Sequence, residues 1–344
     1  MKIKKIILAT ESQHSWAPSK YLDLSDTQVN ELKQYLPTPQ QSIELLHNLG
    51  VAASKSGIDI EHIVINDITS AMDKIRLSSN NDSCVWIVSD GRIFHNSGPL
   101  CAWLKQLDIK TYGIDTTIQS LTDNKYLMSV IAQKHGIKVP ESRLYRGKDE
   151  VAVLDGFSSN EGYFVKPNTL GSQIGISRAS KVNSLKEAVS LSEALHEAYG
   201  VEAIIQSYIA GKDYRIPVIE SKDQVVNFSC CEVSVINKSG EEQDFSTNRI
   251  ECDRRWSLNT VTDKSSEAFS SAAHAVNQLY KLGLIADYSG VDMRGSDETG
   301  YFFLENNVKP FVDQSFKLLA RSIGYDSMGA MFLESIQRDN NRLY

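Results

Sequence analysis

The pattern of the chain changes near residue 142, and this change limits the folds that the sequence can adopt. Before it, short apolar segments alternate with amphipathic stretches of helical period: apolar at 3–9, 60–65 and 84–89, helical around 42–54, 69–77 and 99–107. That alternation predicts a small parallel α/β sheet. Beyond it the segments are β-rich, at 163–165, 174–178, 203–206, 214–219 and 224–235, with one clear helix at 184–199. The predicted fold class is therefore α/β followed by α+β.

The chain has 344 residues, and single hydrophobic cores stop growing near about 250–300 residues. We expect an N-terminal α/β domain over 1–115, a central domain over 116–210 and a C-terminal α+β domain over 211–344. At the start of the central domain, Asp123 is the expected N-cap of a helix at 125–134. The segment 237–259 has no periodicity and is expected to be a long loop, the kind that often acts as a lid.

Charge and cysteine content exclude several classes of protein. A net charge of -7 argues against a nucleic-acid-binding surface, which needs clustered Lys and Arg. The five cysteines have no metal-type spacing, which fits a reducing cytoplasm. The first apolar run is shorter than that of a signal peptide, and nothing approaches the roughly 18 apolar residues of a membrane helix. We expect a cytoplasmic, soluble protein without membrane or nucleic-acid partners.

The most informative motif begins where an apolar strand ends in Lys166. The sequence Lys166-Pro-Asn-Thr-Leu-Gly-Ser-Gln-Ile-Gly175 follows, with a Ser172 hydroxyl inside the loop. A lysine at a strand end and a Gly-rich loop together suit phosphate oxygens. The motif is neither a dinucleotide fingerprint nor a P-loop, and taken alone it is equally compatible with an ordinary hairpin turn.

A second motif spans two strands at 286–294 and 301–306. Glu305 and Asn307 share one strand face, and Asp292 can join them from the neighbouring strand. Carboxylate and amide oxygens are ligands that Mg²⁺ accepts, with phosphate and water completing its shell. The alternative is a solvated hairpin with its polar residues outward.

A third motif, Ala203 to Asp213, is an apolar strand that runs into a Gly turn followed by an acidic residue. The backbone of such a strand can bond adenine, and a nearby carboxylate can hold ribose. A plain strand and turn is the alternative.

In this order the motifs resemble the ATP-grasp superfamily, and its D-alanine–D-alanine ligase branch in particular. Asp123-Asn-Lys125 is similar to that family's M-D-K, and the spacing of Glu305 and Asn307 to its metal-binding E-x-N. Gln206 replaces the usual glutamate of the adenine hinge. The resemblance implies Asp292, Glu305 and Asn307 as metal ligands. It assigns ATP to Lys125, Lys166, Gly171, Ser172, Gln206, Ser207, Tyr208, Ile209, Asp213 and Leu304.

Two departures from the family concern the acceptor substrate. The arginine that the family places two residues before the metal-binding Asp is Gly290 here, and its P-G-x-T-x-x-S has become Pro310-Phe-Val-Asp-Gln-Ser-Phe316. Arg294, on the same predicted strand face, can take over the lost guanidinium as the oxyanion holder, or be a surface arginine. The further substrate-binding candidates are Glu11, Arg249, Phe311 and Phe316.

The resemblance implies a ligase that activates a carboxylate as an acyl phosphate and joins it to an amine. We expect an amino-acid or dipeptide ligase other than a D-alanyl-D-alanine ligase, with Arg294 and Ser172 in catalytic roles. The cofactors are ATP and Mg²⁺, with Mn²⁺ as an alternative, and a homodimer is compatible with the family. Two alternatives stay open: an ATP-grasp enzyme with another acid and nucleophile, and a nucleotide-binding module without turnover.

Overall fold

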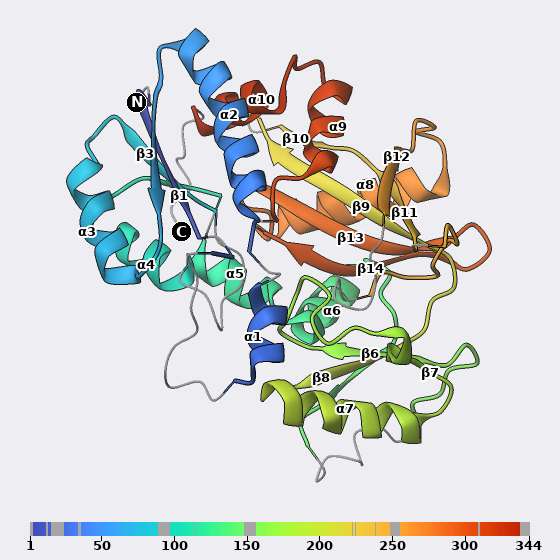
Figure 1. Ribbon diagram of the computed structural model, residues 1–344. Coiled ribbons are helices and arrows are strands. Elements are labelled where there is room, and N and C mark those ends of the chain that lie inside the picture. The colour runs from blue at the N-terminus through green and yellow to red at the C-terminus, as the bar shows by residue number, and fades with distance from the viewer. Residues whose placement is uncertain are drawn as a thin grey trace.

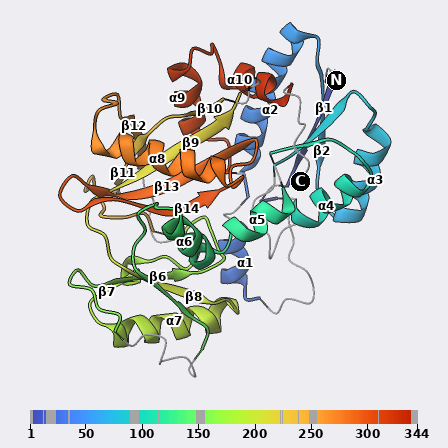
Figure 2. The ribbon, with the colours of Figure 1, turned by 180° about the vertical axis from the view of Figure 1, so that it is seen from behind.

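Three sheets divide the molecule into an N-terminal part, a central lobe and a large C-terminal sheet layer (Figures 1 and 2). The computed structural model describes residues 3–11, 13–14, 24–33, 36–88, 97–113, 115–147, 156–221, 223, 225–237, 239–247, 255–308 and 310–337. In both views the central lobe with α7 lies below the C-terminal sheet, and the N-terminal part lies to one side.

The N-terminal sheet is parallel, as predicted, and has the order β2-β1-β3-β4. Its first and third strands are buried along nearly their whole length, since helices cover them. The strands are β1 (Lys5–Thr10), β2 (Asp59–Val64), β3 (Ser83–Val88) and β4 (Thr111–Tyr112), and the helices are α2 (Pro39–Ser56), α3 (Ile68–Ser78) and α4 (Ser97–Gln106).

The central lobe is a four-stranded antiparallel sheet of order β5-β8-β6-β7 covered by α7 (Leu185–Tyr199). A capping box between Ser184 and Glu187 begins α7, and Gly200 in a left-handed conformation ends it. The strands are β5 (Ser142–Tyr145), β6 (Tyr163–Pro167), β7 (Lys181–Val182) and β8 (Ala203–Ser207), with a short 3₁₀ turn, η2 (Arg178–Ser180).

The third sheet is antiparallel and runs β12-β11-β9-β13-β14, with β10 pairing the far end of β9. One face packs on α8 (Glu267–Lys281) and α6 (Lys125–Lys134) around a common core. The strands are β9 (Lys212–Glu220), β10 (Val226–Phe228), β11 (Cys231–Ile236), β12 (Arg255–Thr260), β13 (Tyr288–Ser296) and β14 (Gly300–Asn307).

Segments distant in sequence fasten these parts together. The closing helices α9 (Gln314–Ser322) and α10 (Met328–Ile336) share a core with α2 and with an aromatic group formed by Trp86, Tyr112, Tyr288, Phe316 and Phe332. Helix α1 (Asp26–Lys33) reaches the central lobe instead, where Leu32 packs with Leu170 and Ile174.

Four local predictions need correction. The segment 174–178, predicted to be β, is a turn that leads into η2. Asn124, rather than Asp123, caps α6, because an unpredicted helix α5 (Thr116–Thr122) ends at Asp123. Helix α1 was also not predicted. The segment 237–259 is not a loop throughout, since β12 pairs along the whole of β11. Within the described parts of the chain, no helix combines the length and apolar character needed to cross a membrane.

Candidate functional site

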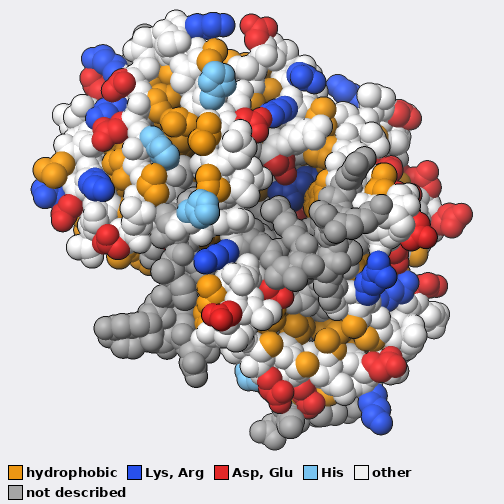
Figure 3. All heavy atoms as spheres, in the orientation of Figure 1, with side chains coloured by type: hydrophobic (Ala, Val, Ile, Leu, Met, Phe, Trp, Pro, Cys, Tyr) orange, Lys and Arg blue, Asp and Glu red, His pale blue; other side chains and the backbone are white. Residues whose placement is uncertain are grey.

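A cavity of about 640 Å³ lies between the central lobe and the C-terminal sheet. In the space-filling view a hollow in the upper right of the molecule has basic and acidic side chains at its floor (Figure 3). The predicted residues that line the cavity are Lys125, Lys166, Gly171, Ser172, Gln206, Ser207, Tyr208, Ile209, Asp213, Asp292, Arg294, Leu304, Glu305, Asn307 and Phe311. The three sequence motifs therefore meet at one site.

Two buried lysines lie on the side of the central lobe. Lys125 begins α6 and is 6% exposed; its Nζ donates to the Leu170 carbonyl at 2.5 Å and lies 3.5 Å from Glu305 Oε2. Lys166 ends β6 and is 5% exposed. The buried Asn168 connects these two elements, because its Oδ1 accepts from the Tyr126 N–H and its carbonyl from the Lys125 N–H. This connection fixes both ammonium groups beside the loop that follows β6.

That loop has an unusual backbone. Ser172 and Gln173, neither of them glycine, have φ angles of 49° and 61°, in the left-handed region that L-residues rarely adopt. Glycine is favoured at position 175 for two reasons: its φ of 71° is in the left-handed region, and a Cβ there would lie 2.8 Å from Pro167 Cγ. Left-handed residues turn successive N–H groups toward one side, which is how backbone forms anion-binding concavities. Strained backbone of this kind is concentrated at functional sites.

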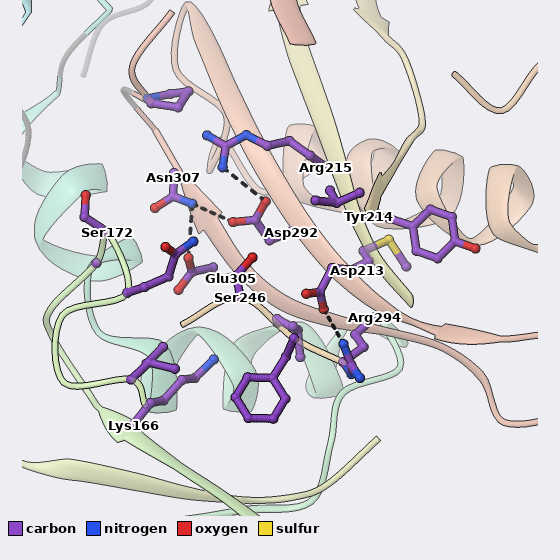
Figure 4. Close-up of a pocket in the computed structure, with 18 of the residues that line it drawn as sticks. Lys166, Ser172, Asp213, Tyr214, Arg215, Ser246, Asp292, Arg294, Glu305 and Asn307 are labelled. Carbon is purple, nitrogen blue, oxygen red and sulfur yellow. Dashed lines mark hydrogen bonds and ion pairs between the residues drawn. The ribbon is translucent and has the colours of Figure 1, made fainter. Parts of the chain in front are cut away.

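Opposite the lysines, two carboxylates face each other across β13 and β14. Asp292 pairs directly with Glu305 in the strand register, and Asn307 Nδ2 lies 3.2 Å from Asp292 Oδ2 and 3.3 Å from Glu305 Oε1. Figure 4 shows the Asn307 amide between the two carboxylates, with Lys166 on the far side of Glu305. Three oxygen-bearing side chains therefore converge on one point of the cavity.

The charges of Asp292 and Glu305 are compensated to different extents by their surroundings. Burial, and then the neighbouring charge of Glu305, raises the pKa of Asp292 to about 7, although Arg215 opposes that rise. Burial would raise the pKa of Glu305 as well, but Lys125 and Lys166 hold it well below its usual value. Burial lowers the pKa of Lys166 to about 8. Asp292 therefore carries a carboxylate whose charge the protein compensates incompletely.

The same cluster fits a hard divalent cation. Its donors are two carboxylates, Asp292 and Glu305, and one amide, Asn307. Among the described residues no group of three or more His, Cys, Asp or Glu side chains is arranged to hold a metal, so the amide is needed as the third donor. A cation would relieve the mutual repulsion of Asp292 and Glu305, and a turn of the Asn307 amide would present its oxygen. The donor chemistry suits Mg²⁺, or Mn²⁺, rather than a soft metal.

Arg294 lies at the other end of the cavity from this cluster. All five of its N–H donors are used: Nε donates to the Ile209 carbonyl, Nη1 to Asp213 Oδ1 and the Asp244 carbonyl, and Nη2 to the Tyr208 hydroxyl and Asp244 Oδ1, at 2.7–3.0 Å. In Figure 4 its guanidinium turns toward Asp213, away from Asp292. This geometry does not support the predicted oxyanion role for Arg294.

Arg215, which was not predicted from the sequence, lies beside the carboxylate cluster. It pairs with Asp292 in the register of β9 and β13, and its Nη1 is 3.7 Å from Asp292 Oδ1. A Cβ built on Gly290 would be 3.7 Å from Arg215 Nη2, so this guanidinium fills space beside the position where the resembled family has its arginine. Its spacing of two from Asp213 on one strand was a signal in the sequence that could have found it.

The remaining predicted residues have other locations. Glu11, at the end of β1, is buried and does not line the cavity. Phe316 is 0% exposed and is therefore not the substrate-binding residue that was predicted, because it packs in the aromatic core against Tyr288 and Phe332. Arg249 lies outside the described residues. Phe164, Phe245, Trp256 and Asp313 line the cavity without having been predicted.

A family model described as the D-ala D-ala ligase C-terminus matches residues 146–326, more than half of the chain. The chain therefore belongs to the D-alanine–D-alanine ligase family of ATP-grasp proteins, a family of ATP-dependent ligases that form carbon–nitrogen bonds.

Individual relatives agree with this assignment. The vancomycin C-type resistance protein VanC1 of Enterococcus gallinarum is 26% identical over 147 residues, which cover 42% of this chain and 41% of that protein. The D-alanine–D-alanine ligase of Porphyromonas gingivalis is 26% identical over 187 residues, or 51% and 55%. The chain thus spans about half the length of these relatives. The D-alanine–D-alanine ligase of Bacillus anthracis in complex with ATP shares the fold, with a TM-score of 0.64 at 16% identity over 98% of this chain and 97% of that one.

Proposed function

We propose that this protein is an ATP-dependent carboxylate–amine ligase that forms an amide through an acyl phosphate. The observation that carries the proposal is the cavity in which two buried lysines, a strained loop and two half-buried carboxylates face one another. Largely desolvated charges of both signs around one cavity are costly to maintain, and such groups are concentrated at functional sites.

ATP is proposed to bind with its phosphates between Lys125, Lys166 and the Gly171–Gln173 loop. Its adenine would lie along the backbone of Ser207–Ile209, where Phe164 and Leu304 supply apolar surface. The ligase of Bacillus anthracis that shares this fold was solved in complex with ATP, which supports ATP as the nucleotide. Asp213 would hold the ribose in this proposal, and it also accepts a hydrogen bond from Arg294.

Asp292, Glu305 and Asn307 would hold Mg²⁺ in this proposal. The bound cation would neutralise phosphate charge during phosphoryl transfer. Lys125 and Lys166 hold the triphosphate in position, and their closeness to Glu305 keeps that carboxylate ionised.

In the reaction, a substrate carboxylate oxygen attacks the γ-phosphorus of ATP, and ADP leaves with the electron pair of the broken P–O bond. An amine then attacks the acyl carbon, and inorganic phosphate leaves as the C–N bond forms. The attack of the amine on the acyl phosphate places a negative charge on the former carbonyl oxygen, and we assign the stabilisation of this oxyanion to Arg215, because it lies beside Asp292 and Arg294 does not. We further propose that the product is not D-alanyl-D-alanine, since Gly290 and the buried Phe316 stand where the family has its arginine and serine.

Acyl-phosphate trapping tests the proposal directly. Purified protein with ATP, Mg²⁺, hydroxylamine and pools of carboxylic and amino acids should give an acyl hydroxamate and ADP. Asp292→Asn should abolish both, whereas Glu298→Gln, an exposed carboxylate in the turn between β13 and β14, should retain both. If no acid supports hydroxamate formation, or if the Asp292 variant works as well as wild type, the proposed activity is wrong.

A further inference from the structure

The cavity extends past the carboxylate cluster to an end that differs in character from the nucleotide side. Phe311, before α9, supplies apolar surface here, and the apolar wall continues over Leu258 on β12 to Val233 on β11, which pairs with Asp213. Two amides, Gln41 and Gln314, and one acid, Asp313, add the polar groups. This part of the cavity therefore offers a mainly apolar surface, with one acid, to a second substrate.

Asp313 is fixed in position by the helix that it begins. Its Oδ1 accepts from the Ser315 N–H at 2.8 Å and from the Ser315 hydroxyl at 2.5 Å, as the N-cap of α9. Its Oδ2 lies 3.6 Å from Arg215 Nε, and the side chain is 34% exposed toward the cavity. One Asp313 oxygen is thus held by the helix while the carboxylate remains accessible from the cavity.

Asp313 is also close to the reacting centre. The Arg215 guanidinium lies between Asp292 and Asp313, with its Nη1 3.7 Å from Asp292 Oδ1 and its Nε 3.6 Å from Asp313 Oδ2. A positively charged group held by Asp313 would therefore be about the width of one guanidinium from the site of acyl transfer. Ammonium next to a carboxylate is a favourable, charge-assisted contact.

A substrate carboxylate would find poor partners at this end. Among the described residues around it, the one cationic side chain is Arg215, which already lies within 4 Å of two carboxylates. Phe316 turns into the core and offers no hydroxyl. A buried carboxylate without a partner costs free energy, so this end should reject an acceptor that carries one beside its amine.

We infer that the acceptor is an amine with an apolar body and no carboxylate next to the nitrogen, held as its ammonium form by Asp313. This inference rests on the proposed function. On transfer the ammonium loses one proton to Asp313, its lone pair forms the C–N bond to the acyl carbon, and the C–O bond to phosphate breaks. The second proton on the nitrogen passes to the departing phosphate, which leaves as hydrogen phosphate.

Matched acceptor pairs test the inference, with a donor acid taken from the hydroxamate screen. Wild-type protein, ATP, Mg²⁺ and that donor are combined with 2-phenylethylamine or phenylalanine, and with isobutylamine or valine of either chirality. Amide is measured by mass and ADP by release. We expect kcat/KM for each amine to exceed that of its amino acid by about tenfold or more, since tenfold corresponds to the loss of one modest polar contact.

Variants of Asp313 separate recognition from structure. Asp313→Asn keeps a good helix cap but loses the charge, and should lower the amine-to-amino-acid ratio by about tenfold. Asp313→Glu should keep part of the preference, and Asp326→Asn, an exposed acid after α9, should leave the ratio unchanged. If hydroxamate forms but amino acids are preferred, or the ratio is the same in Asp313→Asn, the acceptor inference is overturned while the ligase activity stands. If no hydroxamate forms, both are wrong.

Discussion

Lys166 is buried, and burial disfavours the charged form of its ammonium group. Its pKa falls from 10.5 to about 8, with burial as the largest cause. Between pH 8 and 10.5 the folded protein has released this proton while the unfolded chain still holds it, so the free energy of unfolding rises with pH over that window. Below pH 8 the full cost of the buried charge remains.

Lys166→Met should therefore raise the free energy of unfolding of the nucleotide-free protein at pH 7, by about 1–3 kcal/mol, and weaken ATP binding at the same time. Urea unfolding at pH 7 and pH 9.5 measures the first effect and calorimetric titration with ATP the second. Lys186→Met, at an exposed position on α7, is the control and should change neither. A less stable Lys166 variant would show that its charge is well compensated.

Arg215 is proposed to stabilise the oxyanion, so its replacement should affect the chemical step. Arg215→Met should reduce kcat for amide formation by about 10²–10³, the usual effect of removing one oxyanion donor, while KM for ATP changes little. Arg215→Lys, which keeps a charge, should recover part of kcat. Steady-state kinetics with saturating donor and acceptor would measure both, and an unchanged kcat in Arg215→Met would remove the oxyanion assignment.

At the scale of elements, Arg294 connects three parts of the C-terminal half. It joins the hinge at Tyr208 and Ile209, the start of β9 at Asp213, and the segment before β12 at Asp244. The Tyr208 ring also has Lys181 Nζ 3.7 Å from its centre. Part of the segment predicted to be a lid is thus anchored to the nucleotide end of the cavity.

Arg294→Met should release that segment. Asp213 and Asp244 would both lose the guanidinium, although Asp244 keeps Lys181 and the Tyr208 hydroxyl, and the free energy of unfolding should fall by about 1–3 kcal/mol, less than for a fully buried pair because both acids are partly exposed. Amide hydrogen exchange over 241–247 should become faster and KM for ATP should rise. Arg76→Met, on the exposed face of α3, is the control. Exchange in 241–247 equal to wild type would mean that other contacts hold the segment.

The elements that sequence periodicity predicted are those with a strong local pattern. Helix α7 has its capping box and its terminal glycine, and β1 and β3 of the first sheet are largely apolar runs. Helix α1 has eight residues and only Leu32 buried, so a helix of its length depends on docking against the central lobe. Strand β12 likewise depends on its pairing with β11. Such tertiary support leaves little trace in the local sequence.

For the site, the order of the motifs was enough to bring Lys166, Asp292 and Glu305 together, because each motif carries its own residue spacing. The motifs did not decide which arginine lies beside the metal-binding carboxylates. Arg294 and Arg215 both alternate with acidic residues along a strand, and only the pairing of β9 with β13 places Arg215 beside Asp292. Phe316 was misplaced because the rotation of α9 is set by the whole aromatic core.

At the scale of the whole molecule, the N-terminal sheet and the C-terminal half are held in fixed relation by α2 and α10. Gly329 lies where these helices meet, and a Cβ there would be 2.2 Å from the Asn48 carbonyl oxygen of α2, a backbone atom that cannot turn away. Gly50, inside α2 itself, has open space around it, since a Cβ there would meet nothing within 4 Å. The two glycines thus differ in their surroundings, and Gly329 is the second residue of α10 whereas Gly50 lies in the interior of α2.

Alanine at the two positions should therefore have opposite effects. Both substitutions gain helix propensity, about 0.5–1 kcal/mol, so Gly50→Ala should raise the melting temperature. Gly329→Ala gains the same term but must push α10 from α2, at a cost of about 1–3 kcal/mol, and should lower it. Calorimetry of both variants measures the shifts, and hydroxamate formation reports whether separating α2 from α10 disturbs the cavity. Equal stabilisation by both alanines would show that the helices can move apart freely, and the N-terminal part would then not be fixed against the site.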